Sequence, residues 1–172
     1  METKNITVPI GNINLLNHER KTAFLSSRNM PDYCRPAITQ WLDTLNADED
    51  CVMCGDLQKT EHKVILGLVK RGIPTILVLG EPYPKKWPTG IVEAIGDQRL
   101  LALTTTDFLL PWVDKFGMAD ARNRYMIANA SKIVVGFCRP DGQLAKQLKD
   151  VEAEVTLLNE YDPTKEPPAH KR

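Results

Sequence analysis

Short runs of apolar residues recur along the chain, separated by stretches in which apolar positions follow a helical period. Each run is rich in apolar and β-branched residues and is bounded by polar residues or glycine, a pattern that predicts a buried strand. We expect strands at residues 21–27, 51–55, 75–80, 100–104, 132–138 and 154–158.

Between these runs, apolar residues three and four positions apart predict amphipathic helices. Ile38, Trp41 and Leu42 follow this spacing after the first run. Thr60 is a suitable cap for the next helix, which Gly72 closes. We expect helices at about residues 36–45, 60–71, 88–95, 119–130 and 141–150.

Buried strands that alternate with amphipathic helices favour a parallel sheet covered on both faces. The expected fold class is therefore α/β, a three-layer sandwich with a mostly parallel sheet and helices on both faces. We assign residues 20–159 to this domain and residues 1–19 to an N-terminal extension. The polar, proline-rich end of the chain, residues 160–172, is expected to be a flexible tail.

Composition narrows the function classes. A chain of 172 residues with 42% hydrophobic and 26% charged residues suits one globular domain. Lys and Arg number 22, as do Asp and Glu, so no chain-wide basic field attracts DNA or anionic lipid, and any site for a polyanion must be local. No apolar run is long enough to cross a membrane and no leader pattern is seen, so we expect a cytoplasmic protein without a membrane partner.

The cysteine pattern does not indicate a metal or redox site. Cys51 and Cys54 form a C-x-x-C pair, but a spacing of three within a strand points their side chains to opposite faces. The sequence has no second pair and no nearby histidine cluster to complete a zinc site. We therefore expect reduced thiols, no metal and no cofactor.

The strongest candidate site is Arg122, Asn123 and Arg124, which we place in the first turn of the helix at 119–130. In an open parallel sheet, this helix end lies at the carboxyl edge, where such folds bind ligands. Arginine opposes the helix dipole there, and a bound phosphate would resolve the conflict. The alternative is that Arg122 or Arg124 pairs with Asp120, Asp114 or another surface carboxylate. Asn123 shares the expected inward face of the helix.

Other loops reach the same edge. The first strand ends at Ser26, Ser27 and Arg28, which offer hydroxyls and a cation, and Gly55 after the second strand permits close approach of a ligand. The loop after the third strand carries aromatic and basic residues that suit stacking on bases and contact with a nucleic-acid backbone. These residues are Tyr83, Lys85, Lys86 and Trp87. A proline-rich loop that packs its own aromatic rings is the alternative.

In their order along the chain, these motifs resemble the DNA processing protein A (DprA) family, within the SLOG group of nucleotide- and nucleic-acid-binding domains. The matching motifs are Ser26-Ser27-Arg28, Cys54-Gly55, Tyr83-Pro84 and Arg122-Asn123-Arg124. The resemblance implies a Rossmann-like fold in a single-domain version. It also implies binding of single-stranded nucleic acid or a nucleotide by Ser26, Ser27, Arg28, Gly55 and the Arg-Asn-Arg motif.

Three functions follow. The first is DprA-like binding of phosphate groups at the carboxyl edge, without catalysis. The second is an enzyme similar to the LOG (lysine-decarboxylase-like) nucleotide N-glycosidases, for which Glu61 is the one weak acid/base candidate. That branch has a Pro-Gly-Gly-x-Gly-Thr-x-x-Glu loop, which this chain lacks. The third is a non-catalytic scaffold that self-associates, and a homodimer is open under each.

Overall fold

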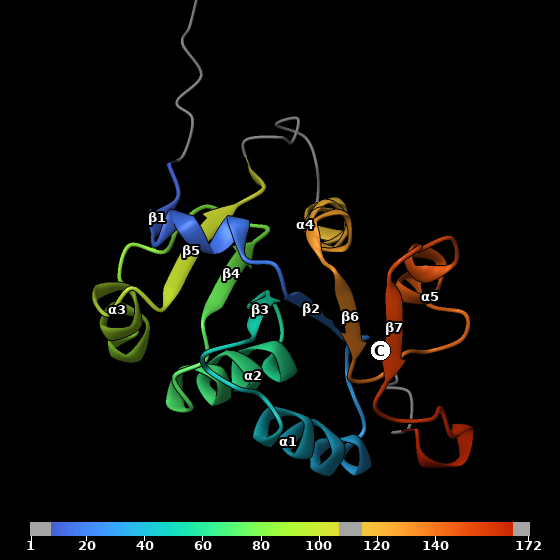
Figure 1. The fold of residues 1–172 in the computed structure, drawn as a ribbon. Coiled ribbons are helices and arrows are strands. Elements are labelled where there is room, and N and C mark those ends of the chain that lie inside the picture. The colour runs from blue at the N-terminus through green and yellow to red at the C-terminus, as the bar shows by residue number, and fades with distance from the viewer. Residues whose placement is uncertain (1–7, 107–114, 167–172) are drawn as a thin grey trace, which may run out of the picture.

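The computed structural model describes residues 8–106 and 115–166, and its described strands form one seven-stranded sheet (Figure 1). The strand order across the sheet is β1-β5-β4-β3-β2-β6-β7. The bounds are Ile10–Gly11 (β1), Lys21–Leu25 (β2), Cys51–Cys54 (β3), Thr75–Leu79 (β4), Leu100–Thr104 (β5), Lys132–Val135 (β6) and Glu154–Leu157 (β7). Each of the six predicted strands is present, so the strand prediction is confirmed.

The strands run parallel except at one edge, where β1 pairs antiparallel with β5. From β2 the chain builds outward through β3, β4 and β5, then returns to place β6 on the other side of β2. Thr22 pairs with Lys132 in this β2–β6 ladder. The direction of building therefore reverses between β2 and β6, and this reversal decides where the crevice described below lies.

Helices cover both faces of the sheet (Figure 1). On one face lie α1 (Arg35–Asp43), α2 (Lys59–Lys70) and α3 (Thr89–Gly96), and on the other lie α4 (Lys115–Asn129) and α5 (Gln143–Leu148). Short 3-10 turns occur at Ile13–Asn17 (η1), Asp32–Cys34 (η2) and Pro163–Lys165 (η4). The α/β, Rossmann-like three-layer prediction is confirmed.

Each face has its own core because successive residues of a strand point to opposite sides. In β2, Phe24 packs toward α1 and α2, whereas Ala23 and Leu25 pack toward α4 and α5. The same alternation separates Cys54 from Cys51, as predicted from their spacing. Both thiols are free and buried, and burial raises the pKa of Cys51 to about 12.

The helix before β6 differs from the prediction. It begins at Lys115 rather than near residue 119, so Arg122, Asn123 and Arg124 lie about two turns inside α4. The first-turn placement, and with it the argument from the helix dipole, is wrong. Asp114, one suggested partner of these arginines, lies outside the described residues.

Two segments outside residues 20–159 contribute contacts. β1 and η1 lie against β5, with Leu15 buried in the core on the α4 side. After β7, the chain continues to η4, and the backbone carbonyl of Glu160 accepts a hydrogen bond from the Tyr33 hydroxyl at 3.0 Å. The domain limits at residues 20 and 159 stay predictions.

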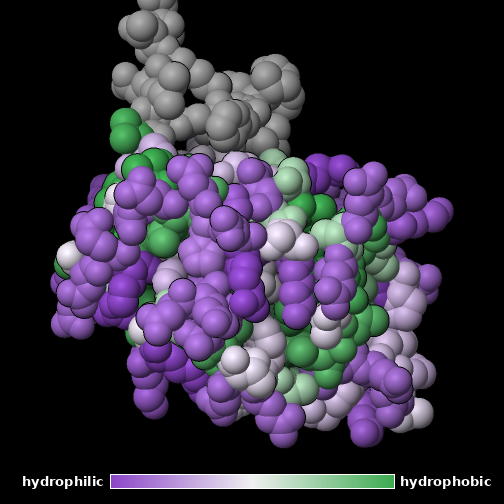
Figure 2. Space-filling view, viewed as in Figure 1, coloured by the Kyte–Doolittle hydropathy of each residue, from purple (hydrophilic) through white to green (hydrophobic). Residues whose placement is uncertain are grey.

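The surface in Figure 2 is mainly hydrophilic, with a hydrophobic area over β7. Val155 and Leu157, at 36% and 58% exposed, stand on this edge strand. Across the described ranges, no helix has both the length and the apolar character needed to cross a membrane.

We predict that Ile133→Ala lowers the free energy of unfolding by about 2–5 kcal/mol, because Ile133 is fully buried between the sheet and α4. Leu157→Ala on the neighbouring strand should change it by less than about 0.5 kcal/mol. Chemical denaturation monitored by circular dichroism measures both. Equal effects of the two substitutions would contradict the assignment of the core.

Candidate functional site

A crevice of about 610 Å³ lies where the building direction of the sheet reverses, at the carboxyl ends of β2 and β6. Open α/β sheets bind ligands at such a reversal because the loops on either side diverge. Among the residues that line the crevice are Ser26, Ser27, Arg28, Arg122, Asn123 and Arg139. The structure therefore brings together five of the predicted phosphate-binding residues.

The β2 loop is held from both sides. The backbone N–H of Ser27 donates to the carbonyl of Phe137 at 2.7 Å, and the Ser27 hydroxyl accepts from the backbone N–H of Arg139 at 3.1 Å. On the other side, the Gln58 amide donates to the carbonyl of Ser26 at 2.9 Å. These bonds order the loop that presents Arg28.

A second cavity, of about 600 Å³, lies on the α1–α2 side of the same loop. It shares Arg28, Leu57 and Gln58 with the crevice, so Arg28 stands at the junction of the two spaces. Arg35, Lys59, Lys63 and Glu81 are the other charged residues of its lining.

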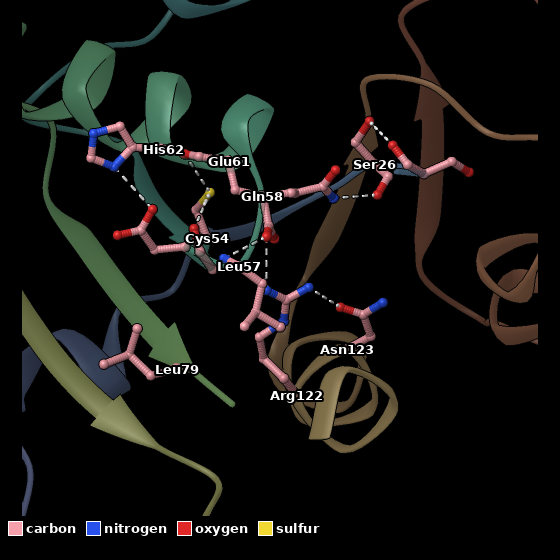
Figure 3. A network of polar contacts seen from close by, with 12 residues as sticks. Ser26, Cys54, Leu57, Gln58, Glu61, His62, Leu79, Arg122 and Asn123 are labelled. Carbon is pink, nitrogen blue, oxygen red and sulfur yellow. Dashed lines mark hydrogen bonds and ion pairs between the residues drawn. The ribbon is translucent and has the colours of Figure 1, made fainter. Parts of the chain in front are cut away.

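Arg122 extends from α4 toward α2, where it forms a buried ion pair with Glu61 (Figure 3). Arg122 Nη1 donates to Glu61 Oε1 at 2.8 Å, and the two side chains are 5% and 1% exposed. The same carboxylate oxygen accepts from the backbone N–H of Leu57 at 3.0 Å. Within the described ranges, Glu61 Oε2 and Arg122 Nε have no hydrogen-bond partner. The charge of Arg122 is thus already compensated from behind the crevice.

Gly55 makes this ion pair sterically feasible. A Cβ at position 55 would lie 2.2 Å from Arg122 Nη1 and 2.8 Å from Glu61 Oε2. Any larger residue would therefore displace the guanidinium or the carboxylate. The close approach that Gly55 permits is to Arg122 and Glu61.

Asn123 lies beside the ion pair rather than against the sheet. Its Oδ1 accepts from Arg122 Nη2 at 3.0 Å, and its Nδ2 donates to Gln147 Oε1 at 3.0 Å. Arg122, with Met126 four residues later, takes the buried side of the helix instead. The prediction that Asn123 points toward the sheet is wrong, because its polar groups are satisfied between α4 and α5.

Arg124 lies apart from the crevice. Its side chain is 68% exposed and pairs with Asp120 at 2.7 Å, which is the ion-pair alternative raised from the sequence. Asp120 also accepts hydrogen bonds from Gln147 at 2.7 Å and Gln143 at 3.2 Å. Partial burial acts to raise the pKa of Asp120, but these hydrogen bonds outweigh it and lower the pKa below its ordinary value.

The aromatic loop after β4 packs against its own surroundings. The Tyr83 hydroxyl donates toward the carbonyls of Val8 and Ala102, each at 3.1 Å, and the Tyr83 and Trp87 rings lie 5.6 Å apart. Lys85 and Lys86 are exposed. None of these four described residues lines either cavity. The geometry agrees with the packed-loop alternative.

The backbone of this chain aligns with those of known solved structures. The fold is similar to that of DNA processing protein A. The structure of DprA from Helicobacter pylori, described for its single-stranded DNA binding mode, aligns with a TM-score of 0.64 and 18% identity over 87% of this chain and 69% of that one. DprA from Streptococcus pneumoniae aligns with a TM-score of 0.56 and 18% identity over 86% of this chain and 62% of that one. No protein-family model and no curated protein matches the sequence.

Sequence reasoning missed two features of the site. The first is the burial of Glu61, which its spacing from Val64, Ile65 and Leu68 on one helical face could have revealed. The second is Arg139, whose contact with the β2 loop depends on strand pairing that no local pattern reveals.

We predict that Arg122→Ala lowers the free energy of unfolding by about 3–5 kcal/mol, because it leaves the buried carboxylate of Glu61 uncompensated. Arg124→Ala, which removes an exposed pair on the same helix, should cost about 0–1 kcal/mol. The double substitution Arg122→Met with Glu61→Leu should be less destabilised than either single change. Equal stabilities for the Arg122 and Arg124 variants would contradict the buried pair.

Gly55→Ala should also be destabilising, because the new methyl group would overlap the Arg122 guanidinium. We expect a loss of about 1–3 kcal/mol, typical of overpacking. Gly96→Ala is the matched control, since its methyl group would meet no atom within 4 Å. A thermal melt of the two variants distinguishes them, and an unchanged Gly55 variant would argue against the close approach.

Proposed function

We propose that this chain binds the phosphate groups of single-stranded nucleic acid, or of a nucleotide, at the carboxyl edge of its sheet. The observation that carries the proposal is the gathering of cations around two cavities that meet at Arg28. Ser26, Ser27, Arg122 and Asn123 belong to this site, with the hydroxyls and guanidinium group that phosphate oxygens accept from.

The charge distribution supports the proposal. The cavity linings contain Arg28, Arg35, Lys59, Lys63, Arg122 and Arg139, against only Glu81 and Asp120. Three of these arginines pair with carboxylates close to the linings, Arg122 with Glu61, Arg139 with Glu166 and Arg35 with Asp32, so the excess of positive charge at this edge is moderate. A potential concentrated at one edge favours binding of an anion there without general attraction to polyanions.

The dimensions favour a short strand. Each cavity falls in the range of about 300–1,000 Å³ typical of small-ligand sites, which is enough for a nucleotide unit. A single strand that crosses Arg28 would place neighbouring nucleotides in the two spaces. The fold is shared with H. pylori DprA, for which a single-stranded DNA binding mode is described, and this likeness adds support.

The enzymatic alternative has less support from the geometry. Glu61, its acid/base candidate, is buried against Arg122 and the Leu57 backbone. His62 beside it contacts Asp56 at 3.0 Å. The self-association alternative has one favourable observation, the exposed Val155 and Leu157 on edge strand β7. We keep a homodimer as a prediction under the binding proposal.

The test is fluorescence anisotropy with labelled oligothymidylates of increasing length and with single nucleotides at low salt. We expect Arg28→Ala to weaken binding of both ligands by about tenfold or more, because the substitution removes charge-assisted hydrogen bonds to phosphate. Lys63→Ala should weaken binding of the oligonucleotide only, because Lys63 lines the second cavity and not the crevice.

The salt dependence of oligonucleotide binding gives a further check. With about three phosphate contacts, the logarithm of the binding constant should fall with the logarithm of salt concentration at a slope near −2.

Arg20→Ala is the control for unspecific loss of charge, since Arg20 precedes β2 at the opposite edge and pairs with Glu49 and Asp50. Circular dichroism melts confirm that each variant is folded. Absence of binding at low salt would refute the proposed function, as would equal binding by the Arg28 and Arg20 variants.

A further inference from the structure

Arg139, on the loop after β6, lines the crevice and forms a two-point ion pair with Glu166 near the end of the described chain. Arg139 Nε donates to Glu166 Oε1 at 2.8 Å, and Arg139 Nη2 donates to Glu166 Oε2 at 3.0 Å. The side chains are 29% and 19% exposed. This parallel arrangement is the one in which a guanidinium also holds two phosphate oxygens.

The guanidinium is positioned independently of that carboxylate. Arg139 Nη1 donates to the carbonyl of Arg28, and Nη2 also donates to the carbonyl of Asn29 at 2.9 Å. The guanidinium carbon lies 4.8 Å from the centre of the Phe137 ring. If Glu166 left, Arg139 would retain these contacts and present two N–H donors beside Arg28.

The segment that carries Glu166 is also attached by other contacts. The Asn159 amide donates to the carbonyls of Cys34 and Gly136 at 3.0 and 2.8 Å, and the Tyr33 hydroxyl donates to the carbonyl of Glu160. The Tyr161 ring packs 6.1 Å from Phe137. Displacement of the carboxylate therefore requires movement of one side chain, with the rest of the segment still bound.

We infer that Arg139 is a second anion-binding residue of the crevice, and that Glu166 occupies it as an internal carboxylate which a ligand phosphate displaces. The inference rests on the proposed function. Its ligand group is the phosphate next to the one held at Arg28, either the following phosphodiester of a strand or the second phosphate of a nucleotide. Because the carboxylate competes for the same donors, it lowers the affinity of the wild-type chain.

Glu166→Gln tests the inference, since it keeps the shape of the side chain and removes its charge. We expect the variant to bind a labelled oligothymidylate about fivefold more tightly, as removal of a competing partly exposed ion pair allows. Glu49→Gln is the matched control, because Glu49 also pairs with an arginine but at the opposite edge of the sheet. Arg139→Ala should weaken binding. The double variant Arg139→Ala with Glu166→Gln should bind no more tightly than Arg139→Ala alone.

A purely structural role of the pair predicts the opposite sign. If Glu166 serves only to hold Arg139 against the β2 loop, Glu166→Gln loosens Arg139 and weakens binding of the oligothymidylate. That result would overturn the inference, whereas continued binding by the wild-type chain would leave the proposed function in place. If the glutamine variant is unstable, Glu166→Ala replaces it. Its affinity for the same oligothymidylate is measured, its folding is checked by thermal melting, and tighter binding is again expected. If neither the wild type nor the Glu166 variants bind nucleotide or oligonucleotide, both the inference and the proposed function fail.

Discussion

The buried ion pair between Glu61 and Arg122 joins the two outer layers of the molecule. Glu61 belongs to α2 on one face of the sheet and Arg122 to α4 on the other, and the two side chains meet past the carboxyl end of β3. This crossing is sterically allowed because Gly55 has no side chain at the point of contact. Two charges out of water are tolerated only with a partner at hydrogen-bonding distance, so the pair constrains both helices relative to the sheet.

The same pair shapes the electrostatics of the crevice. Arg122 presents a guanidinium whose charge is compensated by Glu61, and Arg139 presents one compensated by Glu166. The carboxylate of Glu61 is fully buried, whereas the side chain of Glu166 is 19% exposed. Under the binding proposal, a ligand anion would therefore replace Glu166 more readily than Glu61.

Local patterns were sufficient for six of the seven described strands and for the three layers, because period and turn residues reflect burial directly, whereas the two-residue strand β1 has no such pattern. They failed where tertiary contact decides. Gly117 weakens the helical signal at the start of α4, yet the helix begins at Lys115, and its Met118 backbone closely approaches Gly80 of the β4 loop. The buried position of Arg122 and the hydrogen bonds of the Tyr83 hydroxyl to the carbonyls of Val8 and Ala102 likewise depend on partners distant in sequence. That the β2 loop and α4 share the carboxyl edge follows from the geometry of a parallel sheet, but which turn of α4 lies there does not.

The strand order also bears on how the molecule folds. The crevice exists only between β2 and β6, and their ladder joins residues as far apart in the sequence as Thr22 and Lys132. Closing so long a loop is entropically unfavourable, and contacts of this range form slowly relative to the local pairing of β2 with β3. We therefore expect the half of the sheet from β2 to β5 to assemble before the second half docks. The crevice would then be among the last parts of the chain to acquire its shape during folding.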